Sequence, residues 1–191
     1  MIRISKTFKA DIAHMVITQH LPADFRSKCK NLHGHTVHIV AELEGSVNHE
    51  TRMVLDYSLL KSFKNFIDIY IDHKFIAPLH LEEKFEPFIT AFETFYKENG
   101  IPLTWNDTRN GSVYAYDGRV YAKIKSTMSF LNTPSTTAED MCVFLNEILH
   151  VCLLQSLRSY SFVNIDSIVT RIRFSETEGS EAVSTWKSLR S

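Results

Sequence analysis

The chain has 191 residues, of which 44% are hydrophobic and 23% are charged, and its formal net charge is −1. This size and composition are typical of one globular domain with a full hydrophobic core. The near-zero charge argues against broad electrostatic binding to nucleic acid, which needs a basic face, but a local basic cluster can still meet a small anion.

The three cysteines, Cys29, Cys142 and Cys152, are an odd number without the spacing of a disulfide framework. This usage predicts a reducing, cytoplasmic compartment. The N-terminus has no uninterrupted apolar stretch of the kind found in signal peptides. No run of about 18 apolar residues is present, so we expect no membrane-spanning helix and no membrane partner.

The first part of the chain predicts two strands and a helix. Residues 2–14 alternate loosely, and residues 35–41 place His35, Val37, Ile39 and Ala41 on one face and Thr36, His38 and Val40 on the other, so both segments are predicted to be strands. Apolar residues over 59–70 recur at helical spacing, and Asp56 or Ser58 can cap that helix.

The last part of the chain predicts one helix and two strands. Thr136 and Glu139 fit a capping box at the start of a helix over 136–156. This helix is apolar nearly all round, so it should be buried on more than one side. Alternation over 168–174 predicts a strand, and a shorter one is expected over 182–187.

Residues 82–130 lie between these parts and predict a helix followed by a β-hairpin. Aromatic and apolar residues recur at helical spacing over 85–96. Asp117 and Gly118 supply a two-residue turn between alternating flanks. The expected order is therefore β-β-α-insert-α-β-β in a single domain over 1–191.

The segment His-Gly-His places His33 and His35 two residues apart on the second predicted strand, where their side chains point the same way. Antiparallel pairing with the first strand would bring His14 alongside them. Three imidazoles with an open position form the ligand set of a catalytic zinc site. Nine histidines make a chance pair of this kind common, and His38 has the wrong strand parity to join.

Three further sites have side chains suited to catalysis or binding, but the residues alone do not decide their roles. Cys29, in a polar loop between two lysines, is expected to act as a base or nucleophile. Asp72 can fix the tautomer of His73 for proton transfer, although such a pair often only caps a helix. Glu176, after the third strand, can accept paired N–H groups from a guanidine-like ring or simply be a solvated strand end.

Six segments occur in the order found in one family, and together they resemble the 6-pyruvoyltetrahydropterin synthase and 6-carboxytetrahydropterin synthase family. They are FKADIAH (8–14), CKNLHGH (29–35), MVLDY (53–57), IDH (71–73), TTAED (136–140) and SET (175–177). The resemblance spans most of the chain except residues 82–130, which form an insertion atypical of the family.

The resemblance implies a role for each matching residue. The zinc ligands would be His14, His33 and His35. The catalytic residues would be Cys29 as the base, Asp72 and His73 as the proton relay, and Glu176, which also anchors the pterin ring. Thr137 would contact the pterin, and Arg26, Lys28 and Lys30 are candidates for meeting its triphosphate.

The resemblance also implies a fold and an assembly. The family has the tunnelling fold, an α+β arrangement in which an antiparallel sheet carries two helices on one face. Here an inserted helix and β-hairpin would be added. Subunits of the family form a barrel, usually a homohexamer of two stacked trimers, with active sites between subunits.

The C-x3-H-G-H spacing from Cys29 resembles the bacterial 6-carboxytetrahydropterin synthases of queuosine biosynthesis. The implied zinc-dependent reaction converts 7,8-dihydroneopterin triphosphate to 6-carboxy-5,6,7,8-tetrahydropterin, acetaldehyde and triphosphate. The alternatives are a 6-pyruvoyltetrahydropterin synthase, an aldolase-like enzyme acting on dihydroneopterin, or a non-catalytic zinc-binding scaffold. The expected partners are a small-molecule pterin and further copies of the chain, without nucleic acid.

Overall fold

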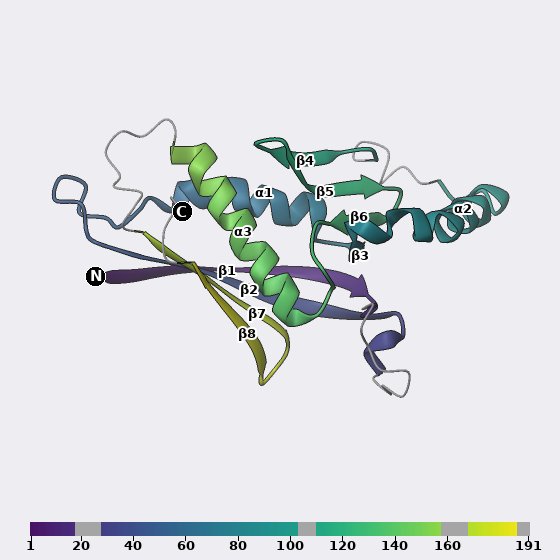
Figure 1. Ribbon diagram of the computed structural model, residues 1–191, viewed down its shortest axis with the longest axis horizontal. Helices are drawn as coiled ribbons and strands as arrows, with labels where there is room; N and C mark the ends of the chain where they lie inside the picture. Colours follow the sequence, from purple (N-terminus) through teal and green to yellow (C-terminus); the bar gives the residue numbers. More distant parts are fainter. Residues whose placement is uncertain (18–27, 103–109, 158–167, 187–191) are drawn as a thin grey trace. The chain divides into compact units, whose positions relative to one another are not determined.

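The computed structural model describes residues 1–17, 28–102, 110–157 and 168–186 (Figure 1). The described strands are β1 (Ile2–His14), β2 (His33–Gly45), β3 (Lys74–Pro78), β4 (Val113–Tyr116), β5 (Arg119–Lys125), β6 (Met128–Leu131), β7 (Val169–Thr177) and β8 (Ser180–Trp186). The described helices are α1 (Lys61–Tyr70), α2 (Glu82–Glu98) and α3 (Ala138–Leu157), with short 3-10 helices η1 (Lys28–Lys30), η2 (Tyr57–Leu60) and η3 (Leu79–Leu81).

The described strands follow the hydrogen-bonded order β4-β5-β6-β3-β1-β2-β7-β8. Pairing is antiparallel except that β3 runs parallel to both of its neighbours, β1 and β6. The sheet is therefore mixed, with parallel pairs added to the antiparallel sheet that the family resemblance implied. The combination of this sheet with separate helices confirms the α+β class.

The chain divides into two compact units, and strands β1 and β2 each contribute to both. The first unit contains residues 1–10, 35–68 and 137–191, and the second contains residues 11–34 and 69–136.

In the first unit, α3 packs on β7 and β8 (Figure 1). As predicted, it is buried on most sides: Met141, Leu145, Ile148 and Leu149 are all inaccessible to solvent. By length and composition α3 is apolar enough to cross a membrane, but most of it is buried inside the protein, which is typical of a core helix.

In the first unit, the buried carboxylate of Glu42 on β2 forms ion pairs with three arginines. Glu42 is 7% exposed. Its oxygens lie 3.6 Å from Arg3, 3.1 Å from Arg171 and 3.0 Å from Arg173. Because a buried carboxylate is costly without such partners, these ion pairs hold β1, β2 and β7 in register.

In the second unit, two strands, β3 and β6, were not predicted from the sequence. All five residues of β3 are buried. A strand covered on both faces reads as a continuous apolar run and lacks the alternation that reveals a half-exposed strand. The same reason applies to β6, whose four residues are also buried.

The inserted helix α2 covers one face of the second unit's sheet. Phe85 and Ile89 of α2 pack with Phe75 and Ala77 of β3 and with Phe130 of β6. On its flank, Glu82 of α2 pairs with Lys123 of β5 at 2.6 Å, and Glu86 pairs with Lys125.

The strand register shows that this face is opposite to the one carrying His14. His14 is paired with Ile76, whereas Ala13 is paired with Phe75. Because successive side chains of a strand point to opposite faces, Phe75 and α2 lie on one face and His14 lies on the other.

The predicted hairpin is confirmed as β4 and β5. Asp117 has φ 49° and Gly118 has φ 75°, the left-handed values that a two-residue hairpin turn requires. The predicted strand over 182–187 is confirmed as β8 as far as Trp186, and Lys187 lies outside the described residues.

Candidate metal and proton-transfer sites

Two of the three candidate metal ligands are oriented by backbone carbonyl groups. His14 is the last residue of β1 and is 1% exposed, and its Nδ1 lies 2.9 Å from the carbonyl oxygen of Thr136. The Nδ1 of His33 lies 2.7 Å from the carbonyl oxygen of Asn31. A carbonyl accepts a hydrogen bond only from a protonated nitrogen, so in the neutral form of each ring it is Nε2 that lacks a proton and can coordinate a metal.

The three histidines lie together. The ring centroids of His14 and His33 are 4.6 Å apart. The ligand atoms of His14, His33 and His35 all lie within 4.8 Å of one another. Both His33 and His35 belong to β2, which holds them on the same side of the strand. A set of three neutral imidazoles fits a divalent transition metal.

Gly34, between these two histidines, lies against β1. A Cβ atom placed on Gly34 would be 3.1 Å from the backbone oxygen of Ile12. The absence of a side chain therefore allows β2 to approach β1 closely. This close approach brings His33 near His14.

Cys29 is exposed in η1, where Lys28 and Lys30 flank it. Its carbonyl oxygen accepts a hydrogen bond of 2.8 Å from the backbone N–H of Val16, two residues after His14. This bond ties the short helix that carries the thiol to the end of β1. The third residue suggested for triphosphate binding, Arg26, lies outside the described residues.

The other two cysteines are buried, as expected for small core residues. Burial raises the pKa of the Cys142 thiol to about 11. Among the three thiols, Cys29 is thus the one exposed to solvent.

Asp72 and His73 form a close carboxylate–imidazole pair. The Nδ1 of His73 lies 2.9 Å from Oδ2 of Asp72, and the imidazole is largely exposed. The backbone of His73 has φ 55°, a left-handed value that is uncommon outside glycine. An exposed imidazole held by a carboxylate can exchange protons with a bound molecule.

A third residue, Asp11, joins this pair. Its backbone N–H donates to Oδ1 of Asp72 at 2.9 Å, and its carbonyl oxygen accepts from the backbone N–H of His73 at 2.7 Å. Side-chain atoms of Asp11, Asp72 and His73 lie within 4.8 Å of one another. Asp11 carries no signal in the sequence, because a carboxylate on an alternating strand looks like a solvent-facing position.

Asp11 and His14 point to opposite faces of β1, because three positions separate them on the strand. The carboxylate of Asp11 and the imidazole of His14 therefore belong to different faces. The structure brings the three histidines together and Asp72 together with His73, but these are two separate groups on β1.

Thr137 caps α3, which corrects the predicted capping box. The backbone N–H of Asp140 donates to Oγ1 of Thr137 at 3.3 Å. The hydroxyl of Thr136 instead donates to the carbonyl oxygen of Met15 at 3.0 Å. Because the Thr136 hydroxyl bonds the segment after β1 instead, the side-chain cap of α3 shifts by one residue, to Thr137.

Glu176 lies at the end of β7 in the first unit and is half-buried. The preceding residue, Ser175, is paired with His38 of β2. The ladder between β7 and β8 is irregular between Phe174 and Thr177, so Glu176 sits within a bulge. Bulges redirect side chains and are frequent next to active sites.

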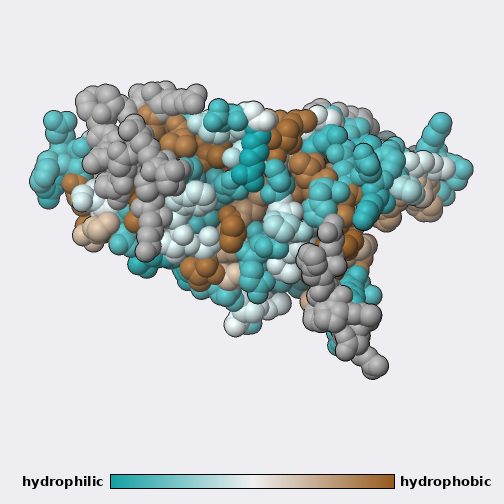
Figure 2. Space-filling model, viewed as in Figure 1, coloured by the Kyte–Doolittle hydropathy of each residue, from teal (hydrophilic) through white to brown (hydrophobic). Residues whose placement is uncertain are grey.

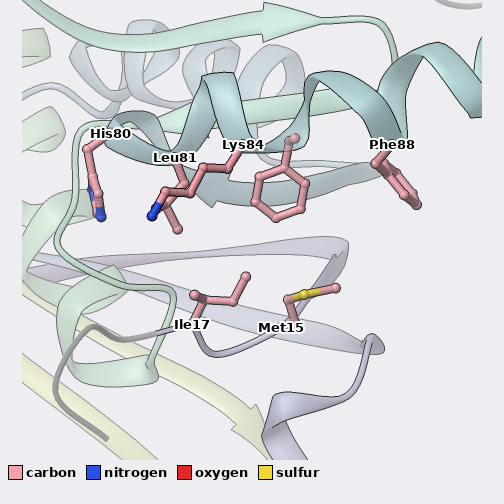
Figure 3. Close-up of a pocket in the computed structure, with 7 residues that line it drawn as sticks. Met15, Ile17, His80, Leu81, Lys84 and Phe88 are labelled. Atoms are coloured by element: carbon pink, nitrogen blue, oxygen red, sulfur yellow. The ribbon is translucent and has the colours of Figure 1, made fainter.

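A cavity of about 500 Å³ lies between α2 and the end of β1 (Figure 3). Figure 3 shows Lys84 and Phe88 of α2 on one side of this cavity, with Met15 and Ile17 on the other. It is lined by Met15, Ile17, His80, Leu81, Lys84, Phe85 and Phe88. The cavity thus belongs to the face covered by α2, and none of the candidate catalytic residues lines it.

Comparison with proteins of known sequence gives two relatives. The 6-carboxy-5,6,7,8-tetrahydropterin synthase of Haemophilus influenzae is 39% identical over 80 residues, which is 40% of this chain and 52% of that protein. A protein of Methanocaldococcus jannaschii, provisionally named as the same synthase, is 26% identical over 146 residues, 75% of this chain and 74% of that protein. The first match thus spans about half the length of the relative.

Comparison with solved structures supports the fold. The 6-pyruvoyl tetrahydropterin synthase of Plasmodium vivax superposes with a TM-score of 0.54 at 13% identity and covers 98% of this chain and 99% of that chain. The tunnelling fold expected from the sequence is therefore confirmed. Residues 3–185 match the family described as 6-pyruvoyl tetrahydropterin synthase. The chain belongs to this family.

Proposed function

We propose that this chain is a zinc-dependent 6-carboxy-5,6,7,8-tetrahydropterin synthase. With one water, it would convert 7,8-dihydroneopterin triphosphate to 6-carboxytetrahydropterin, acetaldehyde and triphosphate, as a step toward queuosine. The names of both relatives and the Cys29-to-His33 spacing support this carboxy-forming branch.

The observation that carries the proposal is the orientation of the metal-binding histidines. His14 and His33 each place Nδ1 against a carbonyl oxygen, and with His35 their ligand atoms lie within 4.8 Å of one another. Carbonyl partners of this kind orient zinc-binding imidazoles in metalloenzymes. When bound, zinc supplies Lewis-acid polarisation of a substrate oxygen.

The remaining residues would bind the substrate and move its protons. We assign Cys29 as the base that removes a proton from substrate carbon, and His73, held by Asp72, as the group that returns one. Glu176 would accept N–H groups of the pterin ring, with Thr137 as a second ring contact. Positioning of this kind lowers the barrier by fixing reacting groups in register.

We infer that the active site is completed by assembly of subunits. The Asp11–Asp72–His73 group and His14 use opposite faces of β1, so one strand does not direct them to a common point. A barrel-forming homo-oligomer, a hexamer in our proposal, would place His73 of one subunit beside the metal histidines of another.

The protein surface is compatible with such an assembly. Figure 2 shows hydrophobic residues reaching the surface among hydrophilic ones. Val143 of α3 and Val183 of β8, both in the first unit, are each more than half exposed. We propose that subunit contacts cover part of this surface, and that the oligomer works in the cytoplasm.

The decisive experiment incubates purified, zinc-loaded protein with dihydroneopterin triphosphate and identifies the pterin product by mass spectrometry. We expect 6-carboxytetrahydropterin with an equal amount of acetaldehyde, and no product from Cys29→Ala. A 6-pyruvoyl product, or cleavage of dihydroneopterin, would place the chain in another branch of the family. If the zinc-loaded oligomer converts neither substrate, the non-catalytic zinc-binding scaffold would be the remaining function.

A further inference from the structure

We propose that Asp11 is a positioning residue for the proton relay of Asp72 and His73. Its main chain would fix the backbone of the pair, and its carboxylate would help to orient the imidazole. This inference rests on the proposed function, which gives His73 its task in proton transfer.

The main-chain bonds explain how the unusual backbone of His73 is maintained. A left-handed φ such as the 55° of His73 is unfavourable for a residue with a side chain and persists only where neighbouring contacts enforce it. The 2.7 Å bond from the N–H of His73 to the carbonyl oxygen of Asp11 supplies one such contact. It holds the residue where β3 begins beside β1.

Asp11 also orients Asp72. Its N–H donates to Oδ1 of Asp72 at 2.9 Å, and this leaves Oδ2 to face the Nδ1 of His73, also at 2.9 Å. One oxygen of the Asp72 carboxylate therefore bonds the main chain of β1, and the other faces the imidazole of His73. Because the first bond comes from a rigid strand, it restricts rotation of the Asp72 side chain.

The carboxylate of Asp11 adds a second negative charge beside the imidazole. Its oxygen lies within 4.8 Å of a ring nitrogen of His73 and of an oxygen of Asp72. A carboxylate at this range adds to the contacts that place the ring. Lys74, the next residue along β3, is paired with Ile12 and buried, so strand parity places it on the face away from Asp11.

The test compares three substitutions of Asp11 in the zinc-loaded enzyme. Asp11→Ala and Asp11→Asn remove the charge but keep both main-chain bonds, so the fold should persist. We expect kcat to fall about tenfold with KM unchanged, because each loses one charge interaction while substrate contacts remain. Asp11→Glu should recover part of kcat. Asp68→Asn, which removes an exposed carboxylate on α1, is the matched control and should leave kcat unchanged.

A second measurement separates this inference from the proposed function. NMR exchange of the His73 ring N–H with solvent does not need turnover, and we expect it to become about tenfold faster in Asp11→Asn. If the wild-type protein has no synthase activity but exchange is faster in Asp11→Asn than in wild type, the role of Asp11 is upheld and the proposed reaction is rejected. Unchanged exchange and unchanged kcat in Asp11→Asn would overturn the role of Asp11.

Discussion

The Nδ1 atom of His14 lies 2.9 Å from the carbonyl oxygen of Thr136, so the buried imidazole at the end of β1 is fixed by the segment that precedes α3. The hydroxyl of the same threonine donates to the carbonyl oxygen of Met15. Thr136 thus holds both His14 and the residue after it. An imidazole held in this way keeps its orientation whether or not a metal is bound.

The first prediction concerns the metal ligands. His14→Ala should lower zinc affinity by at least about tenfold to a hundredfold, because it removes a whole ligand where loss of an outer-shell partner alone has this effect. His38→Ala is the control, since His38 is an exposed histidine of the same strand. Zinc per subunit, measured after dialysis against a weak chelator, should fall in the first variant only. Equal zinc content in both would exclude His14 as a ligand.

The second prediction concerns Gly34. Its substitution by alanine would place Cβ 3.1 Å from the backbone oxygen of Ile12, so β2 must move away from β1 by a few tenths of an ångström. Because His33 and His35 flank this point, we expect weaker zinc binding with little loss of secondary structure. Zinc titration and circular dichroism measure the two effects separately. Full zinc affinity in Gly34→Ala would show that close approach of the strands does not set the ligand spacing.

The third prediction tests whether neighbouring subunits share each active site. His14→Ala and His73→Ala should each be inactive alone. When they are mixed, dissociated and reassembled, random assembly should restore about a quarter of the sites, those with an intact His14 from one subunit and an intact His73 from the other. Synthase activity of the mixture is the readout. No recovery in reassembled hetero-oligomers would place both groups in the active site of one subunit.

The sequence predicted the half-exposed strands well, because alternation reveals them. β1, β2, β7 and the hairpin strands each have one covered and one open face, and their patterns were clear. β3 and β6 are buried on both faces and show no alternation. Their position between β1 and β5 is a consequence of tertiary packing, which the local pattern does not encode.

The candidate site was predictable only where the type and spacing of the side chains identify its residues. His14, His33 and His35 could be proposed from spacing, and Asp72 with His73 from adjacency. The carbonyl oxygens of Thr136 and Asn31 could not, because every residue has such a group and only the fold selects two of them. Asp11 was hidden for a similar reason, since its main-chain bonds depend on β3 starting beside it.

The fourth prediction concerns the buried ion pairs of the first unit. Glu42→Gln removes the charge that Arg3, Arg171 and Arg173 share. We expect a loss of about 1.5–3 kcal/mol, typical of hydrogen bonds to a charged group, because the arginines are partly exposed and keep Glu44 or Glu181 as partners. Glu181→Gln, at an exposed partner of Arg173, should cost less than about 1 kcal/mol. Urea unfolding of both variants measures the difference, and equal losses would show that Glu42 is not a structural centre.

The last prediction is a pH dependence of stability from His150. Burial lowers the pKa of this imidazole below its usual 6.5, and its ring lies 5.1 Å from that of Trp186. The folded protein therefore favours the neutral ring, while the unfolded chain takes up a proton at about 6.5. As pH falls below that value, the unfolded state binds more protons and the free energy of unfolding decreases. Urea unfolding of metal-free protein between pH 7.5 and 5 should show this decrease, and His150→Gln should reduce it. Parallel pH profiles for wild type and variant would mean that the imidazole is equally easy to protonate in both states.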